Sequence, residues 1–217
     1  MLYRSTANIN VYDSLALDRF ATQMSTNRYL KLLSDGQVQL IEDNYTGYVR
    51  SQDFEYLEAV DPKSYSPPKT LTSAQIRACI PGAIAYIKAA MQQPNRYLWG
   101  GTLPPDYDCS GLMQAAFVSM GIWIPRDAYQ QAAFVQAIAL DAIELGDLVF
   151  FGVDKATHVG MYLGEGQYIH SSGQEHGNDG IDINSLAGGD RVADWYAQQL
   201  RGAGRVTRCL QTSLAIG

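Results

Sequence analysis

The chain has 217 residues, of which 47% are apolar and 18% are charged, and its formal net charge is −6. This length and apolar content predict a globular protein with one larger domain or two small ones. The acidic balance and the lack of any cluster of Lys and Arg argue against nucleic acid or an anionic membrane as a partner.

The N-terminus and the cysteines bear on the compartment. No run of roughly 18 apolar residues occurs, and Met1 to Val11 carries one basic residue and no continuous apolar segment. We therefore expect no membrane anchor, no secretion signal and a cytoplasmic location. The three cysteines, Cys79, Cys109 and Cys209, are too few for a disulfide framework, which agrees with a reducing compartment. A Cys79–Cys209 bridge is formally open, although free buried thiols fit the count better.

Short apolar segments with turn signals between them occupy the first part of the chain. The expected strands are Tyr3–Val11, Tyr29–Leu33, Gln37–Ile41 and Tyr48–Val49. Turn signals stand at Ser34-Asp35-Gly36 and over the polar stretch 42–47. Because no helix signal lies among them, these short strands predict a small β-barrel.

A proline-rich stretch follows. Residues 61–73 combine three prolines with small polar residues, and proline lacks the N–H that a helix or a central strand needs. We expect the domain boundary here, with the β-barrel over 1–62, a linker over 63–73 and a second domain over 74–217.

The second domain begins with helical periodicity and continues with strands. Ser73 is expected to cap a helix whose apolar residues are Ile76, Ile80, Ile84 and Ile87. Pro81 should kink or divide this helix near residues 78–79. Further helices are expected over 109–120, 128–135 and 191–200, and strands over 146–152, 158–163 and 167–172. Helices followed by an antiparallel meander indicate an α+β fold.

Cys109 is the most informative residue of this domain. It stands at the start of the expected helix after Asp108, where the helix dipole and the unpaired backbone N–H groups favour a thiolate over a thiol. Cys109 is therefore a candidate nucleophile.

A nucleophilic cysteine needs a base, and the base needs a group that orients it. His158 opens one expected strand and His170 ends the next, with Gly164-Glu165-Gly166 between them. Antiparallel pairing of these strands would bring both histidines to the same end of a hairpin. One histidine could then act as the base and the other could orient it.

Several motifs of this domain resemble one family. They are Tyr97-Leu98-Trp99-Gly100-Gly101, Asp108-Cys109-Ser110-Gly111-Leu112, Pro125-Arg126-Asp127, Leu145–Phe151, His158-Val159-Gly160-Met161-Tyr162 and Tyr168-Ile169-His170-Ser171. In this order, over roughly residues 75–212, they resemble the NlpC/P60 family of cell-wall cysteine peptidases, whose fold is papain-like. The expected barrel is similar to the bacterial SH3 domain that often precedes this catalytic domain. With that arrangement the chain is similar to γ-D-glutamyl-L-diamino acid endopeptidases, which cut murein peptides.

The resemblance implies roles for the residues that match. Cys109 would be the nucleophile, His158 the base and His170 the polar residue that orients the base. The backbone N–H of Cys109 and the hydroxyl of Tyr97 would donate to the oxyanion of the tetrahedral intermediate.

The same resemblance implies contacts with the substrate. Asp108 and Ser110 would hydrogen-bond its polar groups, and Asp127 would bind the N-terminal ammonium of L-Ala. A serine often follows this acidic position, whereas Ala128 stands here, which leaves one hydrogen bond of the pattern in question. Candidates in the barrel for closing the amine end of the site are Glu42, Asp43 and Tyr45.

Simpler interpretations stay open. Asp108 and Asp127 suffice as helix N-caps, and Tyr97 suffices as a strand aromatic. One Cys and two His could form a three-ligand zinc site, as in a zinc-dependent amidase, although the close ligand spacings typical of zinc are lacking. A non-catalytic peptidoglycan-binding protein that works through its barrel is the third alternative.

The favoured interpretation is a cysteine endopeptidase of murein peptides. It would hydrolyse the bond between γ-D-Glu and diaminopimelate in peptides with a free N-terminal L-Ala, during recycling of cell-wall peptides. We expect no cofactor, no metal, and no nucleic acid or membrane as a partner.

Overall fold

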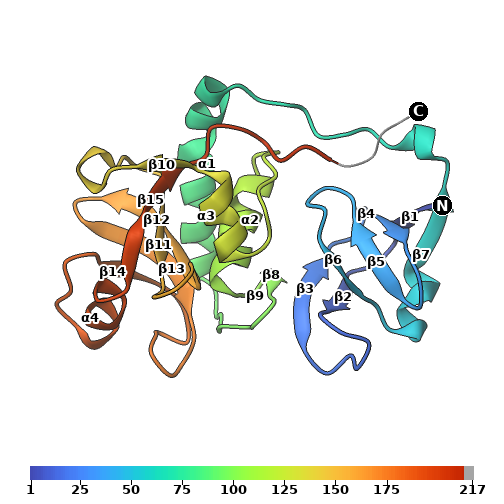
Figure 1. Ribbon diagram of the computed structural model, residues 1–217, viewed down its shortest axis with the longest axis horizontal. Coiled ribbons are helices and arrows are strands. Elements are labelled where there is room, and N and C mark those ends of the chain that lie inside the picture. The colour runs from blue at the N-terminus through green and yellow to red at the C-terminus, as the bar shows by residue number, and fades with distance from the viewer. Residues whose placement is uncertain (213–217) are drawn as a thin grey trace.

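The computed structural model describes residues 1–212, and its N-terminal part is a seven-stranded antiparallel sheet (Figure 1). Its strands are β1 (Leu2–Ser5), β2 (Ile9–Tyr12), β3 (Phe20–Met24), β4 (Tyr29–Leu32), β5 (Gln37–Leu40), β6 (Thr46–Tyr48) and β7 (Leu57–Val60). They lie in the order β3-β2-β6-β5-β4-β1-β7. The expected strand over 3–11 is two strands, and β3 and β7 were not predicted.

One small core joins distant strands of this sheet. It contains Val11 from β2, Met24 from β3 and Leu30 from β4, and each of these side chains is fully buried. Since β3 and β4 are far apart in the strand order, the sheet curls around these side chains. This arrangement is compatible with the small SH3-like domain that the sequence predicted.

Helix α1 (Ser73–Met91) opens the C-terminal part after an extended linker. Thr72, and not Ser73, is its N-cap: its side chain accepts from the N–H of Gln75, whose own side chain accepts from the N–H of Thr72. Pro81 does not divide the helix, contrary to the expectation, because it lies on the exposed side and packing of the opposite face holds the helix together.

The rest of the C-terminal part is built on a six-stranded antiparallel sheet with the order β10-β15-β11-β12-β13-β14. The strands are β10 (Gln136–Ile138), β11 (Leu148–Phe151), β12 (His158–Gly164), β13 (Gln167–Ser172), β14 (Gly180–Ser185) and β15 (Leu200–Arg205), and a separate hairpin pairs β8 (Thr102–Leu103) with β9 (Asp106–Tyr107). The helices are α2 (Cys109–Val118), α3 (Ala128–Phe134) and α4 (Arg191–Ala197). The α+β fold class is confirmed, whereas β15 replaces the end of the helix expected over 191–200.

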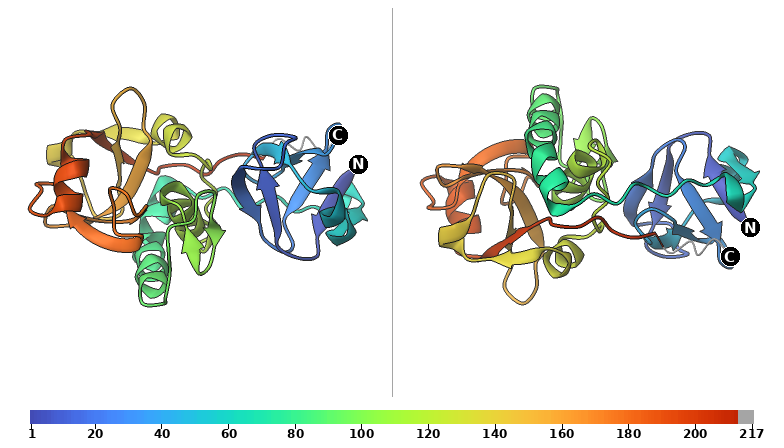
Figure 2. Two further views of the ribbon diagram at one scale, coloured as in Figure 1. Left: turned by 90° about the horizontal axis from the view of Figure 1, so that it is seen from below. Right: turned by 90° about the horizontal axis from the view of Figure 1, so that it is seen from above.

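Each face of this sheet is covered by helices. The larger core joins α1 and α2 to one face through Ile84, Leu112 and Val159. The smaller core joins α4 to the other face through Val192 and Phe151. Figure 2 shows α4 and α1 on opposite sides of the sheet. His158 at the start of β12 and His170 within β13 are therefore buried in the part of the sheet that the helices cover.

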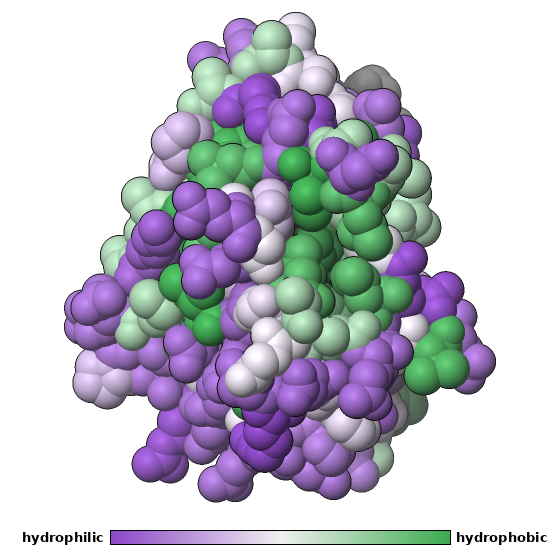
Figure 3. Space-filling view, turned by 90° about the vertical axis from the view of Figure 1, so that its left-hand side faces the viewer, coloured by the Kyte–Doolittle hydropathy of each residue, from purple (hydrophilic) through white to green (hydrophobic). Residues whose placement is uncertain are grey.

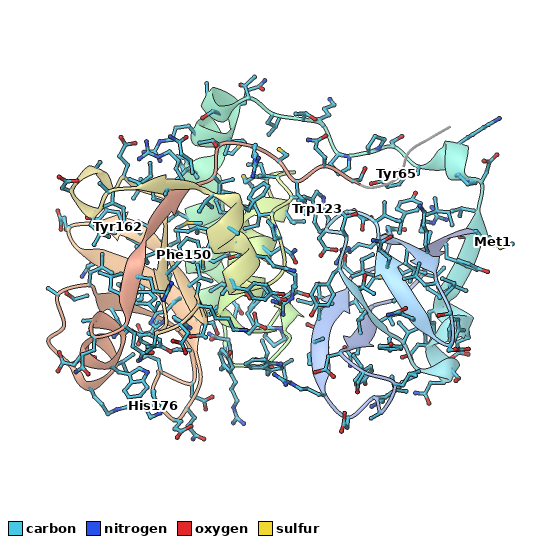
Figure 4. All side chains as sticks on the ribbon, viewed as in Figure 1. Met1, Tyr65, Trp123, Phe150, Tyr162 and His176 are labelled. Carbon is cyan, nitrogen blue, oxygen red and sulfur yellow. The ribbon has the colours of Figure 1, made fainter. Side chains whose placement is uncertain are left out.

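The two parts touch along β3 and the β8–β9 hairpin. The side-chain oxygen of Gln23 accepts from the N–H groups of Thr102 and Leu103, both at 3.1 Å. The guanidinium of Arg28 lies 4.6 Å from the ring centroid of Trp123, which Figure 4 labels between the two parts. From this arrangement we propose the domain limits 1–62 and 74–217 with the linker between them.

The end of the described chain returns to the N-terminal part. The segment after β15 runs beside the linker (Figure 1), and the side chain of Asn44 donates to the carbonyl of Gln211 at 3.2 Å. At the opposite end of the molecule, hydrophilic residues dominate the lower half of the surface and apolar residues gather above them (Figure 3). Within residues 1–212, no helix has the length and apolar character needed to cross a membrane.

Candidate active site

The site begins where α2 begins. Asp108 has an extended backbone and its side chain accepts from the N–H of Gly111 at 2.7 Å, so the chain turns into the helix at Cys109. The helix start predicted at Cys109 is confirmed. Cys109 is buried, and the backbone N–H groups of Val159 and Ser110 lie close enough to its thiol to lower its pKa. Because Val159 follows His158 in β12, the thiol lies at the start of that strand.

The protonation state of the thiol differs from the expectation. Burial, followed by the negative charge of Asp108, raises the pKa of Cys109 to about 12, against the opposing effects of the Val159 N–H and Arg126. The resting protein therefore carries a neutral thiol at Cys109. The helix start alone does not produce a thiolate here, because desolvation of a charge outweighs the favourable dipole.

Both histidines meet as the hairpin predicts. Strands β12 and β13 pair antiparallel, and Nε2 of His158 lies 2.6 Å from Nδ1 of His170. Gly160 makes this close packing possible, since a Cβ there would lie 2.7 Å from the ring of Tyr168. Nε2 of His170 lies 2.8 Å from the side-chain oxygen of Asn184 in β14. Burial lowers the pKa of both histidines, that of His170 to about 4, so both are neutral at pH 7.

Tyr196 of α4 completes the surroundings of the histidines. Its ring stacks on His158 with the centroids 4.2 Å apart and meets His170 edge to face at 5.1 Å. Burial, followed by the nearby Cys109, raises the pKa of Tyr196. Tyr196 carries no signal of this position in the sequence, because helical periodicity over 191–200 marks it only as a residue on the buried face of a helix.

A cavity of about 310 Å³ opens beside the thiol, between the two parts of the molecule. The C-terminal part contributes Tyr97, Trp99, Asp108, Cys109, Ser110, Asp127, Ala128, Tyr129, Lys155, Ala156 and Thr157, and the N-terminal part contributes Asp13, Arg19, Ala21 and Tyr45. The hydroxyl of Tyr97 stays protonated, since burial and then Cys109 raise its pKa. The cavity and the thiol are therefore in contact, and both parts shape the space.

Asp108 and Ser110 are largely engaged within the protein. Arg126 donates to both carboxylate oxygens of Asp108, at 2.6 and 3.1 Å, and to the hydroxyl of Ser110 at 3.0 Å. It also donates to Thr22 in β3 at 2.9 Å, which ties the N-terminal sheet to the start of α2. Arg126 is 1% exposed, so this paired charge is buried. The sequence placed Arg126 in a motif without assigning it a role.

The four residues expected at the amine end of the site, Glu42, Asp43, Tyr45 and Asp127, separate into two groups. Among the described residues, those that line the cavity include Tyr45 and Asp127 but neither Glu42 nor Asp43. The carboxylates of Glu42 and Asp43 pair with Arg28 at 3.2 and 2.9 Å.

Glu42 and Asp43 thus do not line the cavity, and closing the amine end stays a prediction for them. Asp43 also accepts from Gln114 at 3.1 Å, so this carboxylate serves the contact between the two parts. Local spacing near Tyr45 gave no signal of the pairing with Arg28, because Arg28 lies in the segment between β3 and β4.

Asp127 is the cavity carboxylate beside Tyr45. Its backbone N–H donates to the side chain of Gln130 at 3.1 Å, which marks the start of α3. Burial raises the pKa of Asp127, while Arg126 and a hydrogen bond from Tyr129 lower it. Burial and then Asp127 raise the pKa of Tyr45. A cation that entered this end of the cavity would relieve the cost of burying the carboxylate.

Metal coordination finds little support in the geometry. Throughout residues 1–212, no three His, Cys, Asp or Glu side chains form a group that could hold a metal ion. Two of the candidate zinc ligands, His158 and His170, instead direct ring nitrogens at each other at hydrogen-bond distance. The third histidine, His176, stacks on Trp195 at 3.8 Å near α4.

Comparison with known proteins identifies one family. Residues 94–198 match the family model described as NlpC/P60 family. The match includes Cys109, both histidines of the pair and Tyr196.

Two curated proteins of Bacillus subtilis are similar to this segment. A γ-D-glutamyl-L-lysine dipeptidyl-peptidase is 43% identical over 79 residues, which are 35% of this chain and 27% of that protein. A bifunctional muramidase/DL-endopeptidase is 35% identical over 120 residues, which are 51% of this chain and 35% of that protein. The chain thus spans only about a third or less of the relatives it matches.

A solved structure agrees on the fold. An NlpC/P60 family protein from Bacillus cereus superposes with a TM-score of 0.51 at 24% identity, over 95% of this chain and 63% of that one. At this identity the likeness shows a shared fold, and both parts of the chain are included in it.

Proposed function

Since the chain carries an NlpC/P60 family domain, we propose that it is a cysteine peptidase acting on peptidoglycan peptides. One observation carries the proposal: the thiol of Cys109 lies at a helix start and at the edge of a cavity, beside a buried hydrogen-bonded pair of histidines. A thiol, a base and a group that orients the base are the parts that acyl transfer by cysteine needs.

The first half of the reaction forms a thioester. As the sulfur of Cys109 attacks the carbonyl carbon of the scissile amide, its proton passes to His158, because the resting thiol is neutral. The N–H of Cys109 and the hydroxyl of Tyr97 donate to the oxyanion. His158 then gives the proton to the leaving amine as the C–N bond breaks.

The second half releases the enzyme. Water attacks the thioester carbon, and its proton passes to His158. The C–S bond then breaks, the sulfur takes the proton back, and the product leaves with a new carboxyl group.

For the substrate we propose a murein peptide that is cut between γ-D-Glu and diaminopimelate. The names of the relatives support a peptidoglycan peptide, and one of them names the γ-D-glutamyl bond. Asp127 and Tyr45, at the end of the cavity that both parts enclose, would take the ammonium of a free N-terminal L-Ala. A closed amine end would exclude the glycan-linked stem and fit an enzyme that recycles released peptides.

The test compares two peptides by mass spectrometry: L-Ala-γ-D-Glu-meso-diaminopimelate and its N-acetylated form. We expect the wild type to release diaminopimelate from the free peptide and Cys109→Ala to release none. Acetylation removes the ammonium that would pair with Asp127, so kcat/KM for the acetylated peptide should be lower by about 10–100-fold. Asp127→Asn should lower kcat/KM for the free peptide by a similar factor, and Asp141→Asn, in the exposed 3-10 helix Leu140–Ala142 outside the cavity, should not.

A different experimental result would contradict each part of the proposal. Equal cleavage of both peptides would refute recognition of the amine and leave the peptidase intact. Binding of the peptide without cleavage would favour the non-catalytic alternative. Loss of activity with a chelator, but not with a thiol alkylator, would favour zinc.

A further inference from the structure

A line of polar side chains continues from the histidine pair across the sheet, away from Cys109. It passes from His158 in β12 to His170 in β13, then to Asn184 in β14 and Asp190 at the start of α4. The successive separations are 2.6 Å, 2.8 Å and 3.3 Å. His170 and Asn184 are both buried, so water does not compete for the hydrogen bond between them, whereas Asp190 at the end of the line is exposed.

The direction of the hydrogen bonds can be assigned from the far end. Asp190 is the N-cap of α4, and its carboxylate accepts from the N–H groups of Val192 and Ala193 at 2.8 and 2.9 Å. These bonds, that of Ala193 first, lower the pKa of Asp190, so it is ionised at pH 7 and only accepts. Asn184 must therefore turn its NH₂ group to Asp190 and its oxygen to His170.

A second neighbour agrees with this orientation. The side-chain NH₂ of Asn178 donates to the same oxygen of Asn184 at 2.8 Å. If Asn184 were flipped, its oxygen would face the carboxylate of Asp190, and its NH₂ group would face the donor of Asn178. Both contacts would be repulsive.

The protons of the histidines follow from this orientation. The oxygen of Asn184 can only accept, so Nε2 of His170 carries the proton. A neutral His170 then has a bare Nδ1, which accepts from the Nε2–H of His158. Neutral His158 is left with a bare Nδ1, and only a bare ring nitrogen can take the proton of a thiol.

We propose that Asn184, oriented by Asp190, is a positioning residue that sets the tautomer of His170 and through it makes Nδ1 of His158 the basic nitrogen. This inference rests on the proposed function, because it assigns the base of that reaction. It extends the catalytic arrangement by two residues on β14 and α4 that touch neither the thiol nor the cavity described above.

The direct test is ¹⁵N NMR of the imidazole nitrogens. The chain has only three histidines, so each ring can be assigned from His158→Asn, His170→Asn and His176→Asn variants. In the wild type at pH 7 we expect the proton on Nε2 of both His158 and His170. A proton on Nδ1 of either ring would overturn the proposal, whether or not the protein cleaves any peptide.

Variants of Asn184 separate positioning from folding. Asn184→Asp keeps an oxygen that accepts from Nε2 of His170, so it should keep the tautomers and at least about a tenth of kcat. Asn184→Leu removes the acceptor, so Nδ1–H of His170 should become populated and kcat should fall about 10–100-fold with KM unchanged. Wild-type tautomers in folded Asn184→Leu would contradict the proposal.

Variants of Asp190 test whether this carboxylate orients Asn184. Asp190→Asn keeps a good N-cap for α4 but no longer forces the orientation of Asn184, so a mixture of tautomers is expected. The matched control is Asp182→Asn, because Asp182 also lies on β14 and acts on His170 only through its charge. An equal change of the tautomers in both variants would mean that charge, and not hydrogen-bond direction, sets them, and would overturn the role of Asp190.

If Asn184→Leu does not fold, Asp190→Asn and the wild-type spectrum still decide the proposal. Correct tautomers in a protein that cleaves no murein peptide would refute the proposed function and leave the assignment of the protons in place. Cleavage together with the opposite tautomers would refute the assignment of the protons and leave the proposed function in place.

Discussion

At Cys109 two local effects oppose each other. The start of α2 and the N–H groups of Val159 and Ser110 stabilise a negative sulfur, whereas burial and the charge of Asp108 destabilise it. Desolvation is the larger effect, so the thiol is neutral in the free protein. In the proposed mechanism the proton would then move to His158 during the attack rather than before it.

This balance predicts how alkylation of Cys109 depends on pH. Only the thiolate reacts with iodoacetamide, and a pKa raised from 9.0 to about 12 leaves very little thiolate at pH 7. The rate should therefore rise about tenfold per pH unit between pH 7 and 9 and show no plateau there. Peptide mass spectrometry after short exposure measures this rate at Cys109 alone.

Cys79, which is partly exposed on α1, is the internal control in the same digests. A plateau of the Cys109 rate from about pH 5 upward would mean that a thiolate–imidazolium pair exists at rest. In that case the neutral-thiol route would be wrong.

Residues with local signals were predictable and those with remote partners were not. Asp108 before a helical run and His158 at a strand start can be recognised from their neighbours. Arg126 gave no comparable signal, since Asp108 and Thr22, its partners, lie in other elements. The pairing of Glu42 gave no signal for the same reason, because its partner Arg28 lies in the segment between β3 and β4.

At the scale of elements, α1 shows how packing overrides a helix breaker. Pro81 lacks the N–H that would bond to the carbonyl of Arg77, yet the helix continues from Ser73 to Met91. Its apolar face, including Ile80 and Ile84, is buried in the larger core. The proline is accommodated because it points to solvent.

Replacing this proline should stabilise the protein. Pro81→Ala restores a hydrogen bond worth part of the roughly 3 kcal/mol that proline costs inside a helix, while about 1 kcal/mol is lost to a more flexible unfolded chain. We expect the free energy of unfolding to rise by about 1–2 kcal/mol in urea titrations. Peptide cleavage should not change, because Pro81 lies outside the cavity.

The converse substitution is the control. Ala85 is exposed on the same helix, and Ala85→Pro should lower the free energy of unfolding by about 3 kcal/mol or more. No gain from Pro81→Ala would show that the local geometry of α1 has adapted to the proline.

The hairpin of β12 and β13 was readable from sequence, while its neighbour β14 was not. Alternating residues and a glycine turn predicted the hairpin and therefore the meeting of the two histidines. Asn184 lies opposite Tyr168 in the register of β13 and β14, diagonal to His170. A Gly-rich loop separates these strands, so no local pattern fixes that register.

On the scale of the whole molecule, the cavity exists because two parts meet. Tyr45 and Arg19 come from the N-terminal part, and Asp127 comes from the C-terminal part. Gln23 holds them together, since its side chain accepts two N–H groups of the β8 strand. Arg126 adds a buried ion pair that also reaches Thr22.

Gln23→Ala should therefore weaken the contact between the parts. The N–H groups of Thr102 and Leu103 would lose their acceptor, at a cost of about 1–3 kcal/mol in the free energy of unfolding. KM for the free-amine peptide should rise, because Tyr45 would no longer be held against the cavity. Urea titration and steady-state kinetics measure the two effects.

Gln39→Ala in β5, the same change at a strand away from β8, is the control. An unchanged KM in Gln23→Ala, together with a loss of stability, would show that the N-terminal part supports folding but does not shape the amine end. The roles proposed for Tyr45 would then fail.

The sequence by itself determined the α+β class, the helix that starts at Cys109 and the hairpin that joins His158 to His170. Each of these depends on periodicity, capping or turn chemistry within a short stretch of chain. Only the tertiary structure decided that Cys109 is a neutral thiol, that Glu42 and Asp43 pair with Arg28, and that Asn184 stands behind the histidines. Desolvation and pairing between distant segments set these properties, and neither leaves a mark in local spacing.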